Sequence, residues 1–377
     1  MAPASGRRTP LTDILVGRIR QEGPLTFAAF MEACLYHPEH GYYTRPAQQG
    51  GPRDYFTSPD TGSLFARLLA RQLREMWEAL GRPRTFTLIE CGAGTGRLTG
   101  QILTAAAEQA HLFALALRAV LVERSPRLQE QARQSLAEFG DQVEVTGAMP
   151  SLGVTGCVLS NELVDALPVH RVVQRGEQLR EIYVSAREGE LVEIEGEPSA
   201  SALAAYLRKF GSPLEDGHIA EVRLAALDWL ARAATALERG FLFTIDYGHR
   251  ARELYGPAHR RGTLLAYRQH RAHEDWLGWP GEQDLTAHVN FTALEERGKE
   301  LGLETLGCRD QAGFLLALAR AAEFADIETA ESGDREKMAA RLSLRQLIHP
   351  EGMGESFKVL IQGKRVSGAR LSGLDPL

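Results

Sequence analysis

Long apolar runs and paired cysteines are both missing from this sequence, and each absence excludes a class of protein. No stretch of about 18 apolar residues occurs, so nothing in the sequence is expected to span a membrane. The four cysteines show no C-x-x-C pairing and no metal-ligand spacing, which favours buried thiols in a reducing compartment over a disulfide framework. The sequence therefore predicts neither a secreted disulfide-rich protein nor a metal site.

Lysine is also scarce, and arginine supplies nearly all of the positive charge. Lysine occurs only at positions 209, 299, 337, 358 and 364, and the formal net charge is -6. A protein that binds nucleic acid generally needs a positively charged surface, which this composition does not favour. Residues 1–10 contain two arginines but no apolar core, unlike a secretory signal. We therefore expect a cytoplasmic protein if the source is bacterial, or a mitochondrial one if it is eukaryotic, that binds neither nucleic acid nor a membrane.

The pattern of the 377 residues changes near residue 86. Residues 1–85 are mainly helical in pattern and are expected to form an N-terminal helical cap. From residue 86, short apolar strands alternate with helices, which is typical of a mostly parallel sheet covered on both faces. The fold class predicted for 86–377 is α/β, a Rossmann-like domain of about seven strands, with insertions at about 171–215 and 249–290. The first insertion alternates with period two and is expected to be antiparallel, and a helix is expected at 219–238.

A glycine-rich segment follows the strand expected at 86–91. It reads Glu90-Cys91-Gly92-Ala93-Gly94-Thr95-Gly96, and its three alternate glycines would let the backbone turn tightly and approach a ligand closely. A dinucleotide site would need G-x-G-x-x-G, but Arg97 occupies the third glycine position, which makes a nicotinamide dehydrogenase an unfavoured alternative. A carboxylate two residues before the first glycine suits an ammonium group better than a phosphate. S-adenosylmethionine carries such a group and is the predicted cofactor.

Glu123 ends the next expected strand. A carboxylate at this position can accept both ribose hydroxyls of an adenosine in α/β sheets. Together with Glu90, Gly92, Gly94 and Gly96, it forms the predicted cofactor-binding set, to which Asn161 is added because it lies at the end of the strand that should border the cofactor.

Acidic residues follow that same strand. Glu162 comes directly after Asn161, and Asp165 lies three residues further on, on the same side if a helical turn follows. Paired acids at this position would suit a cationic acceptor.

Here the sequence resembles the MidA-like family, the arginine methyltransferases connected with assembly of respiratory complex I. The resemblance covers almost the whole chain and rests on several unrelated blocks in the right order. These blocks are Tyr36–Tyr43, Tyr55–Asp60, Asn161-Glu162 with Asp165–Val169, Ile245–Gly248, Pro280–Glu282, Asp284–Val289, and Met353-Gly354 with Phe357-Lys358. The sequence departs from the family pattern at Asp60, Leu163-Val164, His170 and Asn290, and these departures could change the acceptor.

The resemblance implies symmetric dimethylation of an arginine in a partner protein similar to a complex I subunit. The sequence leaves open whether the protein is a monomer or a homodimer. Carboxylates can hold a guanidinium fork and localise its charge, while proximity supplies much of the rate acceleration. Glu162 and Asp165 are the predicted catalytic residues, with Asp246 and His288 as further members. Two alternatives stay open: a methyltransferase acting on a small molecule, and an assembly factor that binds S-adenosylmethionine without catalysis.

Overall fold

The computed structural model describes residues 8–45, 63–151, 153–269, 271–319, 347, 356–366 and 368–376. The sequence blocks Tyr55–Asp60 and Met353-Gly354 lie outside these residues. Among the described helices, none has the length and apolar character needed to cross a membrane. The chain forms two compact units, one made of Met1–Tyr55, Val164–Trp229 and Gly248–Glu296, the other of Phe56–Leu163, Leu230–Tyr247 and Arg297–Leu377. We call them the antiparallel unit and the parallel-sheet unit.

The parallel-sheet unit is built on a seven-strand path in the order β15-β16-β10-β5-β2-β3-β4. Its strands are β2 (Phe86–Cys91), β3 (Leu117–Val122), β4 (Val143–Thr146), β5 (Val154–Asn161), β10 (Leu237–His249), β15 (Glu304–Asp310) and β16 (Phe357–Lys364). Strands β10, β5, β2, β3 and β4 pair in parallel, and β16 and β15 pair antiparallel. The predicted Rossmann-like sheet of about seven mostly parallel strands is confirmed.

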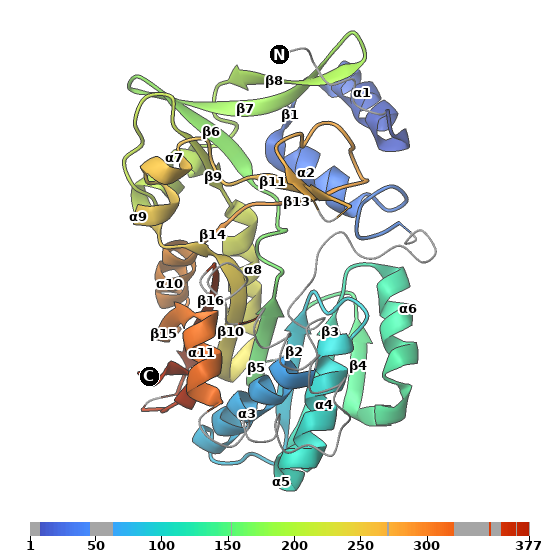
Figure 1. The fold of residues 1–377 in the computed structure, drawn as a ribbon, viewed down its shortest axis with the longest axis vertical. Helices are drawn as coiled ribbons and strands as arrows, with labels where there is room; N and C mark the ends of the chain where they lie inside the picture. The colour runs from blue at the N-terminus through green and yellow to red at the C-terminus, as the bar shows by residue number, and fades with distance from the viewer. Residues whose placement is uncertain are drawn as a thin grey trace. The chain divides into compact units, whose positions relative to one another are not determined.

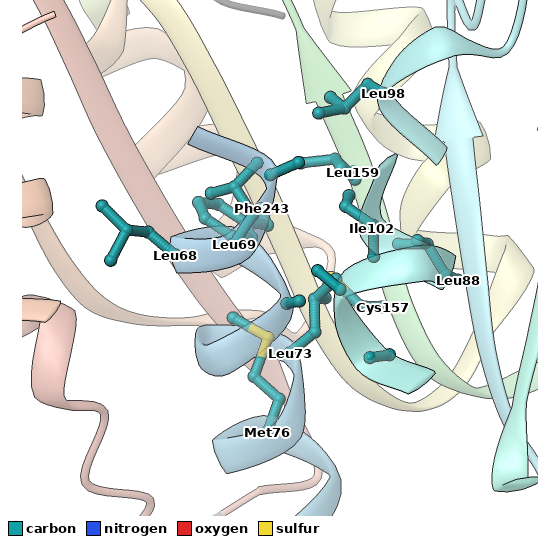
Figure 2. Close-up of a cluster of buried hydrophobic side chains, with 14 of the residues drawn as sticks. Leu68, Leu69, Leu73, Met76, Leu88, Leu98, Ile102, Cys157, Leu159 and Phe243 are labelled. Carbon is teal, nitrogen blue, oxygen red and sulfur yellow. The ribbon is translucent and has the colours of Figure 1, made fainter. Parts of the chain in front are cut away.

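The helices of this unit are α3 (Ser63–Ala79), α4 (Arg97–Gln109), α5 (His111–Ala116), α6 (Pro126–Ser135) and α11 (Gln311–Leu318), with short 3-10 turns at Ala137–Gln142 and Ser372–Leu374. Figure 1 shows α4 and α6 beside the strands β2, β3 and β4. The core lies between α3, α4 and the sheet, where Leu69 and Leu73 of α3 pack with Leu159 of β5 and Phe243 of β10 (Figure 2). This core holds the strand ends in fixed positions.

The antiparallel unit contains a five-stranded sheet and a three-stranded sheet. In the larger sheet the order is β1-β7-β6-β9, with β8 paired to β7. Its strands are β1 (Leu25–Thr26), β6 (His170–Arg175), β7 (Gln178–Arg187), β8 (Glu190–Gly196) and β9 (Ile219–Val222), and the smaller sheet has β11 (Leu265–Arg268), β12 (Arg271–His273) and β13 (Asp284–Thr286). Every pair is antiparallel, as the period-two pattern predicted for the first insertion.

The helices of the antiparallel unit are α1 (Pro10–Glu22), α2 (Phe27–Tyr36), α7 (Ser201–Phe210) and α9 (Ala251–Leu254), followed by a 3-10 turn at Pro257–His259. The short strand β14 (Val289–Asn290) pairs in parallel with Gly248 and His249 at the end of β10. Two helices begin in this unit and continue into the other, α8 (Leu224–Ala236) and α10 (Phe291–Glu300). Residues 1–45 and both expected insertions fall in the antiparallel unit, whereas α3 packs in the parallel-sheet core.

The helix expected at 219–238 is wrong at its beginning. Residues Ile219–Val222 form β9, which pairs with β6, and the helix α8 begins at Leu224. Ala220 and Val222 are buried in a core cluster at a spacing of two residues. Four residues are too few for this spacing to be distinguished from the first turn of a helix in the sequence.

Candidate functional site

The three glycines of the loop after β2 all adopt left-handed backbone conformations. Their φ angles are 72° at Gly92, 56° at Gly94 and 75° at Gly96. Residues other than glycine rarely adopt such values. A Cβ at Gly92 would lie 2.9 Å from Leu163 Cδ1, and a Cβ at Gly96 would lie 2.6 Å from Leu136 Cδ1. Around Gly94 no heavy atom lies within 4 Å of the Cβ position. Packing therefore requires two of the glycines, while the middle one borders open space.

Glu90 is buried within β2, just before this loop. Its side chain accepts a hydrogen bond from Thr99 Oγ1 in the first turns of α4. Burial raises the pKa of Glu90 to about 7, an effect that the hydrogen bonds from Thr99 oppose and the nearby Glu123 slightly reinforces. A carboxylate in this state would be stabilised by a cationic group placed against it.

Glu123 follows β3 and is tied to the same loop. Its Oε2 accepts the backbone N–H of Gly94 at 2.9 Å, and its Oε1 accepts the N–H of Ser125 at 2.8 Å. Burial raises the pKa of Glu123, and these backbone hydrogen bonds oppose that shift. Each carboxylate oxygen can accept more than one hydrogen bond, so the group can still bind a ligand hydroxyl.

Asn161 ends β5, the strand next to β2, and Glu162 follows it directly. The Glu162 backbone has a φ of 52°, which is costly for a residue other than glycine and is often found at functional sites. Its N–H donates to Ile245 O of β10 at 2.9 Å, and Asn161 Nδ2 donates to Glu162 Oε1 at 3.1 Å. Because Leu163 packs against Gly92, this segment lies directly beside the glycine loop.

Asp246 follows Ile245 in β10 and is fully buried, with Oδ1 accepting the N–H of Tyr247 at 3.0 Å. The predicted residues of the parallel-sheet unit therefore gather at the carboxyl ends of four adjacent strands, β3, β2, β5 and β10. The chain leaves β2 toward β3 on one side and later enters β5 on the other. Ligands of open α/β sheets bind at such a switch point.

The two remaining predicted residues, Asp165 and His288, lie in the antiparallel unit. The sequence placed Asp165 on the same side as Glu162 on the condition that a helical turn follows; the structure has no helix there, and Asp165 lies in a turn. Its side chain is buried, and its negative charge contributes to raising the pKa of Tyr267, after the larger effect of burial.

Arg223 also shapes this region, although it was not predicted from the sequence. Its buried guanidinium donates to four backbone carbonyls: Asp165 and Ala287 at 2.8 Å, Leu167 at 3.0 Å and His288 at 3.3 Å. It thus fixes the segments that carry both Asp165 and His288. No local pattern marks this arginine, because its partners are distant in the sequence.

The His288 ring lies beside two other histidines of the same unit. Ring centroids are 5.1 Å apart for His249 and His288, 5.8 Å for His259 and His288, and 5.0 Å for His249 and His259. Burial above all, and then the two neighbouring histidines and Arg223, lowers the pKa of His288 to about 3. His288 is therefore neutral near pH 7.

Comparison with known proteins identifies the family. The family described as "Putative S-adenosyl-L-methionine-dependent methyltransferase" matches residues 68–309, which is more than half of the chain. The chain belongs to this methyltransferase family. The resemblance inferred from the sequence blocks is thereby confirmed.

Relatives of this methyltransferase cover most of its length. Protein arginine methyltransferase NDUFAF7, mitochondrial, from Homo sapiens is 26% identical over 98% of this chain and 87% of its own. The protein of the same name from Xenopus tropicalis is 27% identical over 75% of this chain and 70% of its own. A crystal structure of a Burkholderia thailandensis protein bound to S-adenosyl-homocysteine is 32% identical, covers 96% of this chain and 94% of that chain, and has a TM-score of 0.86.

S-adenosylmethionine is therefore the cofactor of this methyltransferase, as predicted. The residues present fit it on structural grounds. The loop after β2 leaves open space at Gly94, and the buried carboxylates of Glu90 and Glu123 lie at the ends of the adjacent strands β2 and β3, at the switch point of the sheet. Carboxylates suit the ammonium and hydroxyl groups of this cofactor.

Proposed function

We propose that this methyltransferase modifies an arginine side chain of a partner protein and forms symmetric dimethylarginine. The names of the human and Xenopus relatives support an arginine acceptor, and the MidA-like resemblance supports a symmetric product and an acceptor similar to a complex I subunit. The observation that carries the proposal is Glu162, a carboxylate held in a left-handed conformation beside the glycine loop.

In this proposal the parallel-sheet unit holds the cofactor by its strand ends. Glu123 accepts the ribose hydroxyls, and Glu90 balances the ammonium group of the methionine moiety. Gly92, Gly94 and Gly96 allow the backbone to come close, and Asn161 borders the sulfonium side. Glu90 and Glu123 are both buried, which strengthens their interaction with a charged or polar ligand.

Glu162 holds and orients the acceptor guanidinium. The side chain is half-buried, and its Oε1 is fixed by Asn161 Nδ2. Arginine stays protonated in proteins and is a poor nucleophile, so a carboxylate that accepts its N–H groups localises the positive charge away from the attacking nitrogen. Asp165, three residues further along the chain, is proposed as a second such carboxylate, and the buried Asp246 as a support for the Glu162 segment.

The bound cofactor supplies an electrophilic methyl group. A guanidinium nitrogen forms the new C–N bond while the C–S bond breaks, and the electron pair of that bond stays on the sulfur of S-adenosylhomocysteine. The nitrogen releases one proton. The residues of the chain contribute orientation and electrostatic stabilisation to this transfer.

The test is to incubate the purified protein with methyl-labelled S-adenosylmethionine and cell lysate. Label should enter protein and be recovered after hydrolysis as symmetric dimethylarginine. Label found only in small molecules would replace the proposal with a small-molecule methyltransferase. Binding of S-adenosyl-homocysteine without any label transfer would favour a non-catalytic assembly factor.

Two variants separate the roles within the site. Glu162→Gln should lower label transfer at least tenfold while changing affinity for S-adenosyl-homocysteine less than threefold, as is typical of a residue acting mainly on the transition state. Glu188→Gln is the matched control, because Glu188 also has a left-handed backbone, with a φ of 55°, in the turn between β7 and β8. Equal losses of binding and transfer in Glu162→Gln would show a structural role instead.

A further inference from the structure

Three histidines of the antiparallel unit point their rings at one another. His249 ends β10, His259 ends the 3-10 turn at Pro257–His259, and His288 immediately precedes β14. One ring nitrogen from each lies within 4.8 Å of the corresponding nitrogens of the other two. Three imidazoles converging from three segments form a set of ligands suited to a transition-metal ion.

A single residue orients two of these rings. Glu253 places its carboxylate Oε2 3.3 Å from His249 Nδ1 and its backbone carbonyl 2.9 Å from His259 Nδ1. A carbonyl can only accept, so His259 Nδ1 carries the proton and Nε2 holds a lone pair in the neutral ring. Metal-bound histidines are commonly oriented in this way, by a carboxylate or a carbonyl on the nitrogen remote from the metal.

The backbone around the histidines is fixed by further contacts. The His288 N–H donates to Thr263 Oγ1 at 3.0 Å, and its carbonyl accepts from Arg223 at 3.3 Å. The N–H of His259 donates to Gly256 O at 3.0 Å. Because β14 pairs with the end of β10, His249 and His288 come from hydrogen-bonded neighbouring segments. Ligands carried on such a scaffold need little ordering when an ion binds.

We infer that His249, His259 and His288 form a binding site for a divalent transition-metal ion of the zinc type. Three imidazoles match the ligand preference of Zn²⁺ and leave one coordination position for water. The guanidinium of Arg223 is engaged by four backbone carbonyls, and the Glu253 carboxylate supplies a negative charge beside His249. The inference assigns His288, which the sequence analysis placed among the catalytic residues, to the metal site instead, and it does not rest on the proposed methyl transfer.

Binding would draw the rings together. In tetrahedral Zn²⁺ sites with bonds of about 2.0–2.1 Å, the ligand nitrogens lie about 3.4 Å apart. The three ring nitrogens here lie within 4.8 Å of one another, so they would have to move closer together. All three rings are only partly buried, so rotations of their side chains can close this difference. The ion would then link the end of β10, the turn at 257–259 and the segment before β14.

To test this, the 377-residue chain is treated with a chelator, the chelator is removed, and Zn²⁺ is titrated by calorimetry. We expect one Zn²⁺ per chain, and a higher melting temperature once it is bound. His259→Ala should weaken binding at least 100-fold, and Glu253→Gln about 10-fold, the usual range for loss of a residue that orients a ligand. His111→Ala, on the exposed surface of α5, is the control and should bind as the wild type does.

Far-UV circular dichroism and binding of S-adenosyl-homocysteine verify that each variant is folded. A titration of the wild type that shows no saturable site of one Zn²⁺ per chain would overturn the inference. So would equal Zn²⁺ affinity in the wild type, His259→Ala and Glu253→Gln, because the ion would then be held elsewhere.

Discussion

Glu90 makes the stability of the free protein depend on pH. Its pKa is raised from an ordinary 4.5 to about 7, so between these values the folded state binds more protons than the unfolded state. The free energy of unfolding therefore falls as pH rises from about 4.5 to about 7, by about 3 kcal/mol from this one group. Glu90→Gln removes this dependence. The unfolding free energy of the variant minus that of the wild type should therefore rise by about 3 kcal/mol from pH 4 to pH 8. Urea unfolding without cofactor measures this difference.

The same variant tests the proposed role of Glu90 toward the cofactor. Losing the carboxylate should weaken binding of S-adenosyl-homocysteine about tenfold or more at pH 8, because the ammonium group would lose its counter-charge. A stability difference between the two proteins that is the same at pH 4 and pH 8 would contradict the first expectation. Unchanged affinity would remove Glu90 from the cofactor site.

Gly94 and Gly176 provide a matched pair of glycines. Both have a φ of 56°, and neither has a heavy atom within 4 Å of the Cβ position. Alanine at either position should cost about 1–2 kcal/mol of stability, because left-handed backbone is unfavourable for it. Only Gly94→Ala should also weaken S-adenosyl-homocysteine binding, by tenfold or more, since its methyl group would enter the proposed cofactor space. Calorimetric affinities that fall equally in both variants would show that the loss comes from general destabilisation.

At the scale of elements, Arg223 joins the start of α8 to two loops. Arg223→Lys keeps the charge, but an ammonium group cannot reproduce the planar fork that contacts four carbonyls. Buried acceptors left without a donor are costly, so unfolding in urea should show a loss of about 3 kcal/mol. Arg232→Lys, on the exposed face of the same helix, is the control and should change stability by less than about 0.5 kcal/mol. Similar stabilities for the two variants would mean that the four contacts contribute little.

The elements that the sequence predicted well are those specified by local pattern. The strand at 86–91 and the glycine loop were predicted because an apolar run, alternate glycines and a helix stand next to one another in the chain. β9 was missed because its strand character depends on pairing with β6, about fifty residues earlier. For the same reason, the convergence of His249, His259 and His288 could not be predicted from the sequence. Their spacing has no regular pattern, and only the pairing of β14 with β10 brings two of them together.

At the scale of the whole molecule, the two units are interleaved along the chain. The chain passes between them after residues 55, 163, 229, 247 and 296. Each unit has its own buried cluster, and the core of the parallel-sheet unit draws on segments as distant as Leu69, Phe243 and Val359. The expected division into a cap at 1–85 and a domain at 86–377 followed the order of the sequence. A parallel sheet is instead completed by strands that arrive late in the chain.

Because the two units are interleaved, we predict that a fragment containing the cofactor motif neither folds nor binds the cofactor when it is separated from the rest of the chain. A fragment of residues 63–163 contains β2 to β5 and every proposed cofactor residue, but it lacks β10 and β16. Without β10, the Glu162 N–H loses Ile245 O as its acceptor, and one edge of β5 is left unpaired. We expect the fragment to show no cooperative unfolding transition and no calorimetric binding of S-adenosyl-homocysteine, whereas the full chain shows both. If the fragment bound the ligand as tightly as the full chain, the glycine loop and Glu123 would suffice for the site. The position of Glu162 would then have to be explained without its support from β10.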